Sequence, residues 1–283
     1  MSRAQSAGRS IVVGIDGSDT AINAAKWAVP EAISRDIPLR LVYVTRGEQL
    51  GAPTAGLDLD TQHAESALRA AAAAVQALGT EVKVETAVVH GSPEQVLIDE
   101  SRDAAMMCVG SVGIGLLAQM VLGSTAGALA QKAHCPVAII RPDHDVGRSD
   151  SGWIAVVVND SPDNDAVLEQ GFREARLRNA PILALGVWRL GVGEIPYGPL
   201  NRRLGRWVDR YREIHVRPAA ARAGAAEFLA RTQEPVQLAV VGAAEAHEVA
   251  RIVGPVGEPL FGRCATCSVL VVRGSTAAVA TSG

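Results

Sequence analysis

The chain has 283 residues, enough for two domains of ordinary size, each with its own core. Hydrophobic residues make up 48% of the chain and aromatic residues only 4%, so we expect a core of Val, Ile, Leu and Ala. A formal net charge of −3 gives no global attraction to nucleic acid or to an anionic membrane. The sequence has no basic cluster interleaved with aromatic residues and no apolar run of about 20 residues, which argues against a nucleic-acid reader and a membrane span.

Apolar and amphipathic segments alternate along the first half. Strands are expected at residues 10–15, 39–44, 82–89, 106–109 and 137–140. Helices are expected at 19–35, 61–78, 93–103 and 124–132, with a loop over 46–59. Asp19 and Ser124 are the expected N-caps of the first and last of these helices. The alternation predicts βαβ units and a parallel sheet, and right-handed crossovers give five strands the order 3-2-1-4-5.

The chain repeats itself. Residues 10–18 and 36–44 return at 153–161 and 179–187, both with an offset of 143. Residues 107–110 and 135–141 return at 239–242 and 267–273, both with an offset of 132. The second copy is therefore 11 residues shorter between its second and fourth strands. We expect two tandem α/β domains, 1–142 and 153–283, joined by a polar linker at 143–152.

A glycine-rich loop follows the fourth expected strand and leads into a helix. Gly110 and Gly113 open it, and Gly123 and Ser124 close it. Such loops let backbone N–H groups approach phosphate oxygens, and the next helix offers its positive end. Glycine removes the Cβ that would block this approach and permits positive φ, and the Ser124 hydroxyl could reach a phosphate. The alternative is a loop that uses glycine only for tight turns.

Asp16 ends the first expected strand, and Gly110 ends the fourth. In a 3-2-1-4-5 sheet these two strand ends are neighbours at the switch point, where ligands bind. A carboxylate there could accept hydrogen bonds from a ribose or an adenine amine. Its alternative role is to cap the following turn.

Three segments together with the loop resemble the universal stress protein family. They are 11–18, 90–93 and 135–141, and Gly110, Gly113, Gly123 and Ser124 satisfy the G-x2-G-x9-G-[ST] pattern of the ATP-binding branch. The resemblance covers 10–141 and 153–273, nearly the whole chain. It implies two tandem Rossmann-like domains of the adenine nucleotide alpha hydrolase-like type.

The resemblance also implies a site for ATP, with Mg²⁺, in the first half. Asp16 would contact the adenosine, Val44 would offer backbone groups to the adenine, and the loop would hold the phosphates. The implied binding residues are Asp16, Gly17, Ser18, Val44, Gly110, Gly113, Gly115, Gly123, Ser124 and Thr125. In the family the fifth strands of two domains commonly pair, which implies an intramolecular pseudo-dimer here and leaves a further homodimer open.

Two departures qualify this site. No Lys or Arg lies between Gly110 and Ser124, so the loop suits weak binding or a less charged nucleotide. In the second half Glu245 replaces the second loop glycine, Asn159 matches Asp16, and Pro255 follows Gly254 where the first half has Gly123 and Ser124. We expect this copy to bind no nucleotide.

The leading hypothesis is a cytoplasmic, nucleotide-dependent regulatory protein of the stress response that an unidentified protein partner recognises. The first ten residues lack the apolar core of a signal peptide. A slow ATPase is the alternative, but there is no Walker lysine, arginine cluster or base-and-nucleophile set. A nucleotide-free interaction scaffold is a third reading.

The cysteines and histidines predict no metal site. Cys264 and Cys267 form one C-x-x-C without the second pair that a zinc site needs, and the six histidines lack metal-binding spacing. Cys135 and Cys267 occupy equivalent positions of the repeat, and Cys108 lies in an apolar run typical of inert thiols.

Overall fold

The computed structural model describes most of the chain. The described residues are 9–45, 54–113, 122–142, 152–161, 163–187, 197–221, 224–254 and 267–273, with the backbone alone for 54–58. Gly115, Cys264, Pro255 and nearly all of the expected linker lie outside these ranges.

The first half alternates strands with helices. Its elements in chain order are β1 (Ile11–Ile15), α1 (Asp19–Arg35), β2 (Leu39–Thr45), α2 (Thr54–Gln76), β3 (Val84–His90), α3 (Pro93–Glu100), β4 (Met106–Gly110), α4 (Ser124–Lys132) and β5 (Val137–Ile140). The expected strands and helices are all present, and the bounds of α4 and β5 agree with the sequence prediction.

The second half repeats this plan. Its elements are β6 (Trp153–Val158), α5 (Asn164–Leu177), β7 (Ile182–Gly186), α6 (Tyr197–Arg210), β8 (Val216–Ala220), α7 (Ala225–Arg231), β9 (Val236–Gly242), the 3₁₀ helix η1 (Ala243–Glu248), α8 (Val249–Val253) and β10 (Ser268–Val272). Helix α6 has 14 residues where α2 has 23, so much of the 11-residue shortening falls on this helix.

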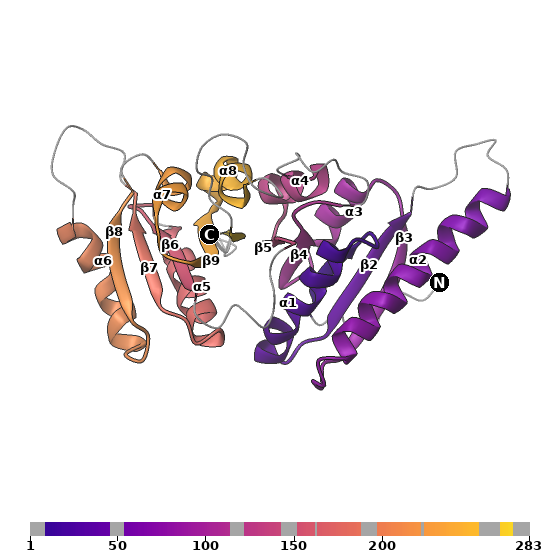
Figure 1. Ribbon diagram of the computed structural model, residues 1–283, viewed down its shortest axis with the longest axis horizontal. Coiled ribbons are helices and arrows are strands. Elements are labelled where there is room, and N and C mark those ends of the chain that lie inside the picture. The colour runs from indigo at the N-terminus through magenta and orange to yellow at the C-terminus, as the bar shows by residue number, and fades with distance from the viewer. Residues whose placement is uncertain are drawn as a thin grey trace, which may run out of the picture.

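All ten strands form one sheet in the order β3-β2-β1-β4-β5-β10-β9-β6-β7-β8. Each half therefore has the predicted order 3-2-1-4-5. Pairing is parallel within each half, and β5 pairs with β10 in the antiparallel sense. The expected pairing of the two fifth strands is observed, and it joins the halves edge to edge (Figure 1).

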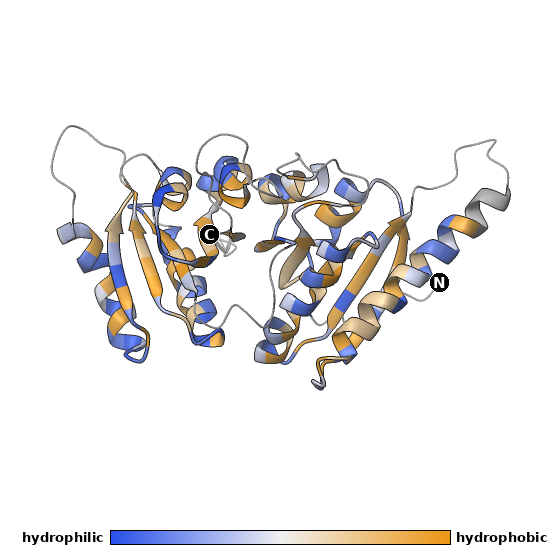
Figure 2. Cartoon of the chain, viewed as in Figure 1, coloured by the Kyte–Doolittle hydropathy of each residue, from blue (hydrophilic) through white to orange (hydrophobic). Residues whose placement is uncertain are grey.

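Helices cover both faces of the sheet, and each strand sends alternate side chains to the two faces. Ile11 and Val13 belong to the core cluster that includes residues of α1, α2, α5 and α6 on one face, whereas Val12 belongs to the cluster that includes residues of α3, α4, α7 and α8 on the other. Figure 2 shows the central strands as continuously apolar, as expected of parallel strands buried on both faces.

Helix α2 differs most from the sequence prediction. It begins at Thr54, within the expected loop 46–59, and ends at Gln76 rather than at 78. The glycine in its first turn suggested a loop, but one glycine costs a helix only about 1 kcal/mol relative to alanine. A 23-residue helix packed along the sheet tolerates that cost.

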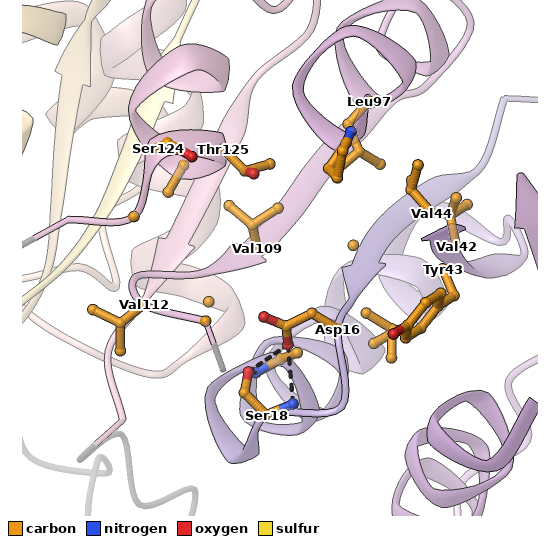
Figure 3. Close-up of a pocket in the computed structure, with 18 residues that line it drawn as sticks. Asp16, Ser18, Val42, Tyr43, Val44, Leu97, Val109, Val112, Ser124 and Thr125 are labelled. Atoms are coloured by element: carbon orange, nitrogen blue, oxygen red, sulfur yellow. Dashed lines mark hydrogen bonds between the residues drawn. The ribbon is translucent and has the colours of Figure 1, made fainter. Parts of the chain in front are cut away.

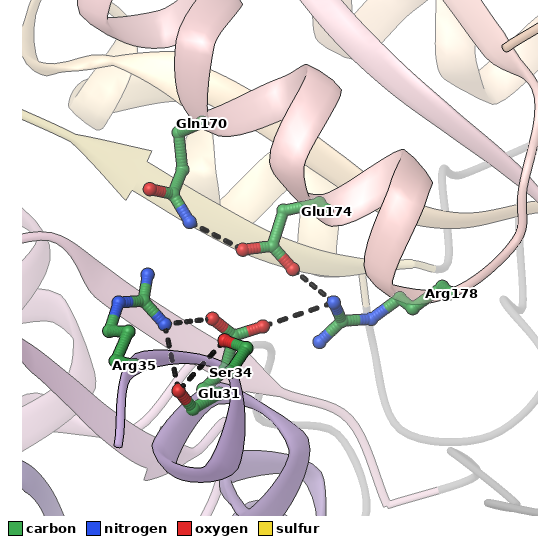
Figure 4. Close-up of polar contacts among 6 residues, drawn as sticks. All are labelled: Glu31, Ser34, Arg35, Gln170, Glu174 and Arg178. Atoms are coloured by element: carbon green, nitrogen blue, oxygen red, sulfur yellow. Dashed lines mark hydrogen bonds and ion pairs between the residues drawn. The ribbon is translucent and has the colours of Figure 1, made fainter. Parts of the chain in front are cut away.

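A charged cluster fastens α1 of the first half to α5 of the second (Figure 4). Glu31 and Arg35 correspond to Glu174 and Arg178 through the repeat offset of 143. Each arginine pairs with the glutamate of its own helix, and Arg178 also pairs with Glu31 across the interface at 3.1 Å. The Arg178 guanidinium lies 4.3 Å from the ring centroid of Trp27.

The pKa values of the two glutamates in this cluster are shifted in opposite directions. Burial favours a higher pKa for Glu31, but Arg178 and Arg35 outweigh it, and its pKa lies below 4.5. Burial and then the charge of Glu31 raise the pKa of Glu174 to about 8, although Arg178 opposes them. In this cluster Glu174 Oε1 accepts a hydrogen bond from Gln170 Nε2 at 2.5 Å, and Glu174 Oε2 accepts from Arg178.

Candidate functional site

A cavity of about 210 Å³ opens in the first half where β1 and β4 end. Its walls come from these strands, β2, the start of α1, α3 and the first turn of α4. Figure 3 shows Asp16 and Ser18, the β2 side chains, Leu97 and the α4 residues arranged around it. This is the switch point of the 3-2-1-4-5 sheet, as the sequence predicts.

The loop after β1 is held by its own side chains. Asp16 Oδ1 accepts hydrogen bonds from the Ser18 amide at 3.0 Å and from the Ser18 hydroxyl at 2.6 Å. Ser18 Oγ accepts from the Ala21 amide and so caps α1. The predicted N-cap, Asp19, is instead the first helical residue, because the hydroxyl one position earlier already meets the first free amides. Asp16 therefore fulfils its alternative capping role and still lines the cavity.

One hydrogen bond from the first turn of α1 reaches the glycine-rich loop. Ser18 Oγ lies 2.9 Å from Thr20 Oγ1, and Thr20 Oγ1 donates to the carbonyl of Val112. Two segments 92 residues apart in sequence are thereby joined across the switch point.

The first two loop glycines are needed for space. A Cβ on Gly113 would overlap Asp16 Oδ2, and a Cβ on Gly110 would lie 2.6 Å from Thr20 Oγ1. Gly110, Gly113 and Gly123 do not use the positive φ that glycine permits. Gly110 and Gly113 therefore leave room for the close approach of Thr20 and Asp16.

Helix α4 directs its N-terminal turn at the cavity. Gly123, with φ −67° and ψ 152°, is the N-cap, and Ser124 is the first helical residue. The prediction of Ser124 as N-cap is wrong by one position. Gly123 has no side chain to satisfy the first free amides, so these remain for another acceptor.

An apolar wall completes the cavity. Val42 and Val44 of β2, Leu97 of α3 and Val109 of β4 line it, and Tyr43 lies beside them. Burial, and then Asp16 and Asp60, raise the pKa of the Tyr43 hydroxyl, which stays protonated and can donate. No Lys or Arg is among the described lining residues.

The structure brings most of the implied binding residues together. Those that line the cavity are Asp16, Ser18, Val44, Gly110, Gly113, Gly123, Ser124 and Thr125. Gly17 lies in the β1–α1 loop with φ 87° but is not part of the lining, and Gly115 lies outside the described residues.

Sequence reasoning missed Thr20, Leu97 and Val112. Leu97 could have been found as an apolar residue one turn into the helix that begins at Pro93. Thr20 carries no comparable signal, because its partner is the Val112 backbone in the other loop.

The corresponding place in the second half is occupied by its own glutamate. Glu245 Oε2 accepts from the Gly242 amide at 3.1 Å, and Oε1 accepts from Asn159 Nδ2 at 3.1 Å. These partners are the counterparts of Gly110 and Asp16. Burial raises the pKa of Glu245, although the hydrogen bonds from Asn159 and the backbone oppose this shift. The sequence predicted a carboxylate that repels phosphate, and the structure shows that carboxylate bound internally.

Other kinds of site receive no support from the described part of the chain. No group of three or more His, Cys, Asp or Glu side chains there is placed to hold a metal ion. No helix within the described ranges has the length and apolar character needed to cross a membrane.

The fold and the cavity define a tandem, doubly wound α/β protein with a ligand-sized hollow at the switch point of its first half. The universal stress protein family model matches residues 8–141. A universal stress protein of Mycobacterium tuberculosis (strain H37Rv) is 52% identical over 265 residues, which cover 94% of this chain and 96% of the relative. Another from the same strain is 42% identical over 272 residues, 94% of this chain and 96% of that relative. The chain belongs to the universal stress protein family.

A solved universal stress protein from Archaeoglobus fulgidus DSM 4304 has the same fold across both halves. It superposes with a TM-score of 0.69 at 15% identity, covering 93% of this chain and 96% of that chain. The Rossmann-like tandem arrangement predicted from the sequence is confirmed at the level of the fold.

Proposed function

We propose that the first half, residues 1–142, is a domain that binds one adenine nucleotide in the cavity at the β1–β4 switch point. The observation that carries this proposal is the closeness of Gly113 to the Asp16 carboxylate, in a cradle that any side chain would fill. Gly110, Gly113 and Gly123 do not have positive φ, so a left-handed backbone is not what requires glycine at these positions.

The cavity offers suitable groups to each part of a nucleotide. The base suits the apolar side chains of Val42 and Leu97, with the backbone of Val44 within reach of its polar edge. The Asp16 carboxylate suits ribose hydroxyls as an acceptor. The phosphates suit the glycine loop and the first turn of α4, where Ser124 and Thr125 line the cavity.

Phosphate charge would be met by backbone dipoles rather than by a cation. Because no Lys or Arg is among the described lining residues, a monophosphate suits the site better than a bare triphosphate. ATP would bring Mg²⁺ with it, since the described residues offer no acidic cluster to hold the ion separately.

The second domain, residues 153–283, is proposed to bind no nucleotide. The amide of Gly242 and the amide group of Asn159 already donate to Glu245, so a phosphate or ribose would have to displace an internal carboxylate. The protein then acts as a nucleotide-dependent regulator of the stress response, in which occupancy of one site alters a surface read by a protein partner.

Calorimetric titration of the full chain with AMP, ADP and ATP, each with and without Mg²⁺, tests this proposal. We expect a stoichiometry near one for every ligand that binds, and Mg²⁺ should strengthen ATP binding but not AMP binding. A stoichiometry of two would refute the closed second site. Absence of binding by all three nucleotides would refute the proposed function, and turnover measured in parallel would reveal an ATPase.

A further inference from the structure

Two arginines at equivalent positions of the repeat each donate hydrogen bonds to the other half of the chain. Arg141 directly follows β5, and Arg273, its counterpart at an offset of 132, directly follows β10. Arg273 Nη2 donates to the carbonyls of Ala130 at 2.7 Å and Leu129 at 3.3 Å. Arg141 Nη1 donates to the carbonyl of Val253 and, at 3.3 Å, to that of Gly254. Each half thus sends one arginine to a helix end in the other half.

The antiparallel pairing of β5 with β10 explains why Arg273 reaches α4. Val269 is opposite Ile139 and Val271 is opposite Val137, so the chain leaving β10 passes the start of β5. Helix α4 ends at Lys132, just before β5. The residue that follows β10 therefore emerges beside the C-terminal end of α4.

The two ends of α4 have different partners. Its first turn lines the cavity of the first half, and its last turn meets Arg273 of the second half. Leu129 and Ala130 are buried. The Leu129 carbonyl already accepts from the Ala133 amide at 3.0 Å, whereas the carbonyls that follow it in the last turn lack intrahelical donors. The guanidinium supplies a donor for the Ala130 carbonyl and places positive charge at the negative end of the helix dipole.

The remaining contacts of α4 also divide between the halves. The helix packs against α3 of its own half and against η1 and α8 of the second. Its orientation is therefore set partly by the second half, and a nine-residue helix that tilts at one end also moves its other end.

We propose that Arg273 is a positioning residue, supplied by the second half, for the nucleotide site of the first half. By holding the Leu129 and Ala130 carbonyls it directs the N-terminal amides of α4 at the phosphate of the ligand. The proposal rests on the proposed nucleotide function, and it gives the second half, with its own crevice closed, a role in binding. Since coupling of this kind is reciprocal, bound nucleotide also tightens the packing of the halves.

The test compares Arg273→Gln and Arg273→Lys with the matched variant Arg141→Gln in the full chain. Affinities for AMP and for adenosine are measured by calorimetry, and unfolding temperatures are measured alongside. We expect Arg273→Gln to bind AMP at least about fivefold more weakly, at the low end of couplings between sites. It should bind adenosine nearly normally, because α4 faces the phosphate. Arg273→Lys should recover part of the loss.

Arg141→Gln separates positioning from general loosening of the interface. It removes an equivalent crossing contact that ends on α8, so it should lower the unfolding temperature and leave AMP affinity within about twofold. Equal losses in Arg141→Gln and Arg273→Gln, or unchanged AMP affinity in Arg273→Gln, would overturn the proposal. If the wild-type chain binds no nucleotide, the proposed function itself is refuted. That result differs from normal AMP binding by Arg273→Gln, which refutes only the role of Arg273.

Hydrogen exchange of the wild-type chain gives a second measurement that needs no variant. AMP should slow exchange along α4 as far as the Ala133 amide, which donates to the Leu129 carbonyl at 3.0 Å. Protection confined to the first turn of α4 would overturn the proposal even if Arg273→Gln does not fold.

Discussion

The two halves of the chain have the same sheet but different crevices. In the first, Gly113 leaves room beside Asp16, and the cavity reaches the first turn of α4. In the second, Glu245 takes the position of Gly113 and accepts hydrogen bonds from Gly242 and Asn159. In the second crevice the Gly242 amide and the Asn159 side chain are thus satisfied internally by Glu245. A carboxylate on the same chain competes with any ligand at high effective concentration, so a difference of this kind needs no change of fold.

The largest expected effect comes from giving the first crevice the residue of the second. Gly113→Glu should abolish nucleotide binding, with a loss of at least about 100-fold, because the side chain overlaps Asp16 and adds negative charge where phosphate is to lie. Calorimetry with AMP measures this. Gly205→Glu is the matched control, since a Cβ on Gly205 of α6 would meet no atom within 4 Å and the helix should tolerate the change. Normal binding by Gly113→Glu would place the phosphate elsewhere.

A smaller loss is expected when the carboxylate unique to the first crevice is removed. Asp16→Ala should weaken binding by about 1–3 kcal/mol, the usual cost of a lost hydrogen bond to a charged group. AMP and ATP should lose similar amounts, because we propose that Asp16 contacts the nucleoside that both ligands share. Asn159→Ala, the counterpart in the second half, should leave affinity unchanged. A loss confined to ATP would assign Asp16 to metal or phosphate instead.

Glu31 and Glu174 are equivalent residues of the two halves whose pKa values differ. The pH dependence of stability tests this difference. The unfolded chain releases the Glu174 proton near pH 4.5, whereas the folded chain keeps it to about pH 8. The folded state binds more protons over this interval, so the contribution of Glu174 to stability falls as pH rises through it. Glu31, whose pKa is lowered, contributes in the opposite sense, and its stabilisation is lost as pH falls below 4.5.

Glu174→Gln removes this titration and keeps an oxygen that can accept from Gln170 or Arg178. We expect the variant to gain a few degrees in unfolding temperature relative to wild type as pH rises from about 5 to about 8. Thermal unfolding at several pH values measures the difference. Glu169→Gln, on the exposed side of α5, should follow the wild-type profile. Parallel profiles for Glu174→Gln and wild type would show that Glu174 is ionised in the folded state.

The smallest effects are expected at the cysteines. Cys135 and Cys267 are both buried free thiols, and burial raises the pKa of each to about 12, so neither offers a thiolate at neutral pH. Elemental analysis should find no stoichiometric zinc, and Cys264→Ser should leave nucleotide affinity and unfolding temperature nearly unchanged. Nucleotide affinity that switches with thiol oxidation in wild type but not in Cys264→Ser would make the second half a redox sensor.

The sequence was sufficient for the architecture and for most of the candidate site. Continuous apolar runs mark strands buried on both faces, and their alternation with helices leaves few allowed topologies. That reasoning places Asp16 beside Gly110 from the order of strands alone. The start of α2 was missed because the glycines and proline of residues 46–59 favour a loop, whereas one glycine inside a helix costs only about 1 kcal/mol.

What the sequence by itself determined is the pair of repeats, the order of strands in each and the position of one intact glycine loop. Tertiary structure alone decided which polar contacts join distant segments, both within the first half and between the halves. The link between Thr20 and Val112, the Arg178–Glu31 pair and the contact from Arg273 to Ala130 join residues 92, 147 and 143 positions apart. Periodicity reports which face of an element is buried, but a polar contact at such separation depends on how whole elements pack, and no local pattern encodes it.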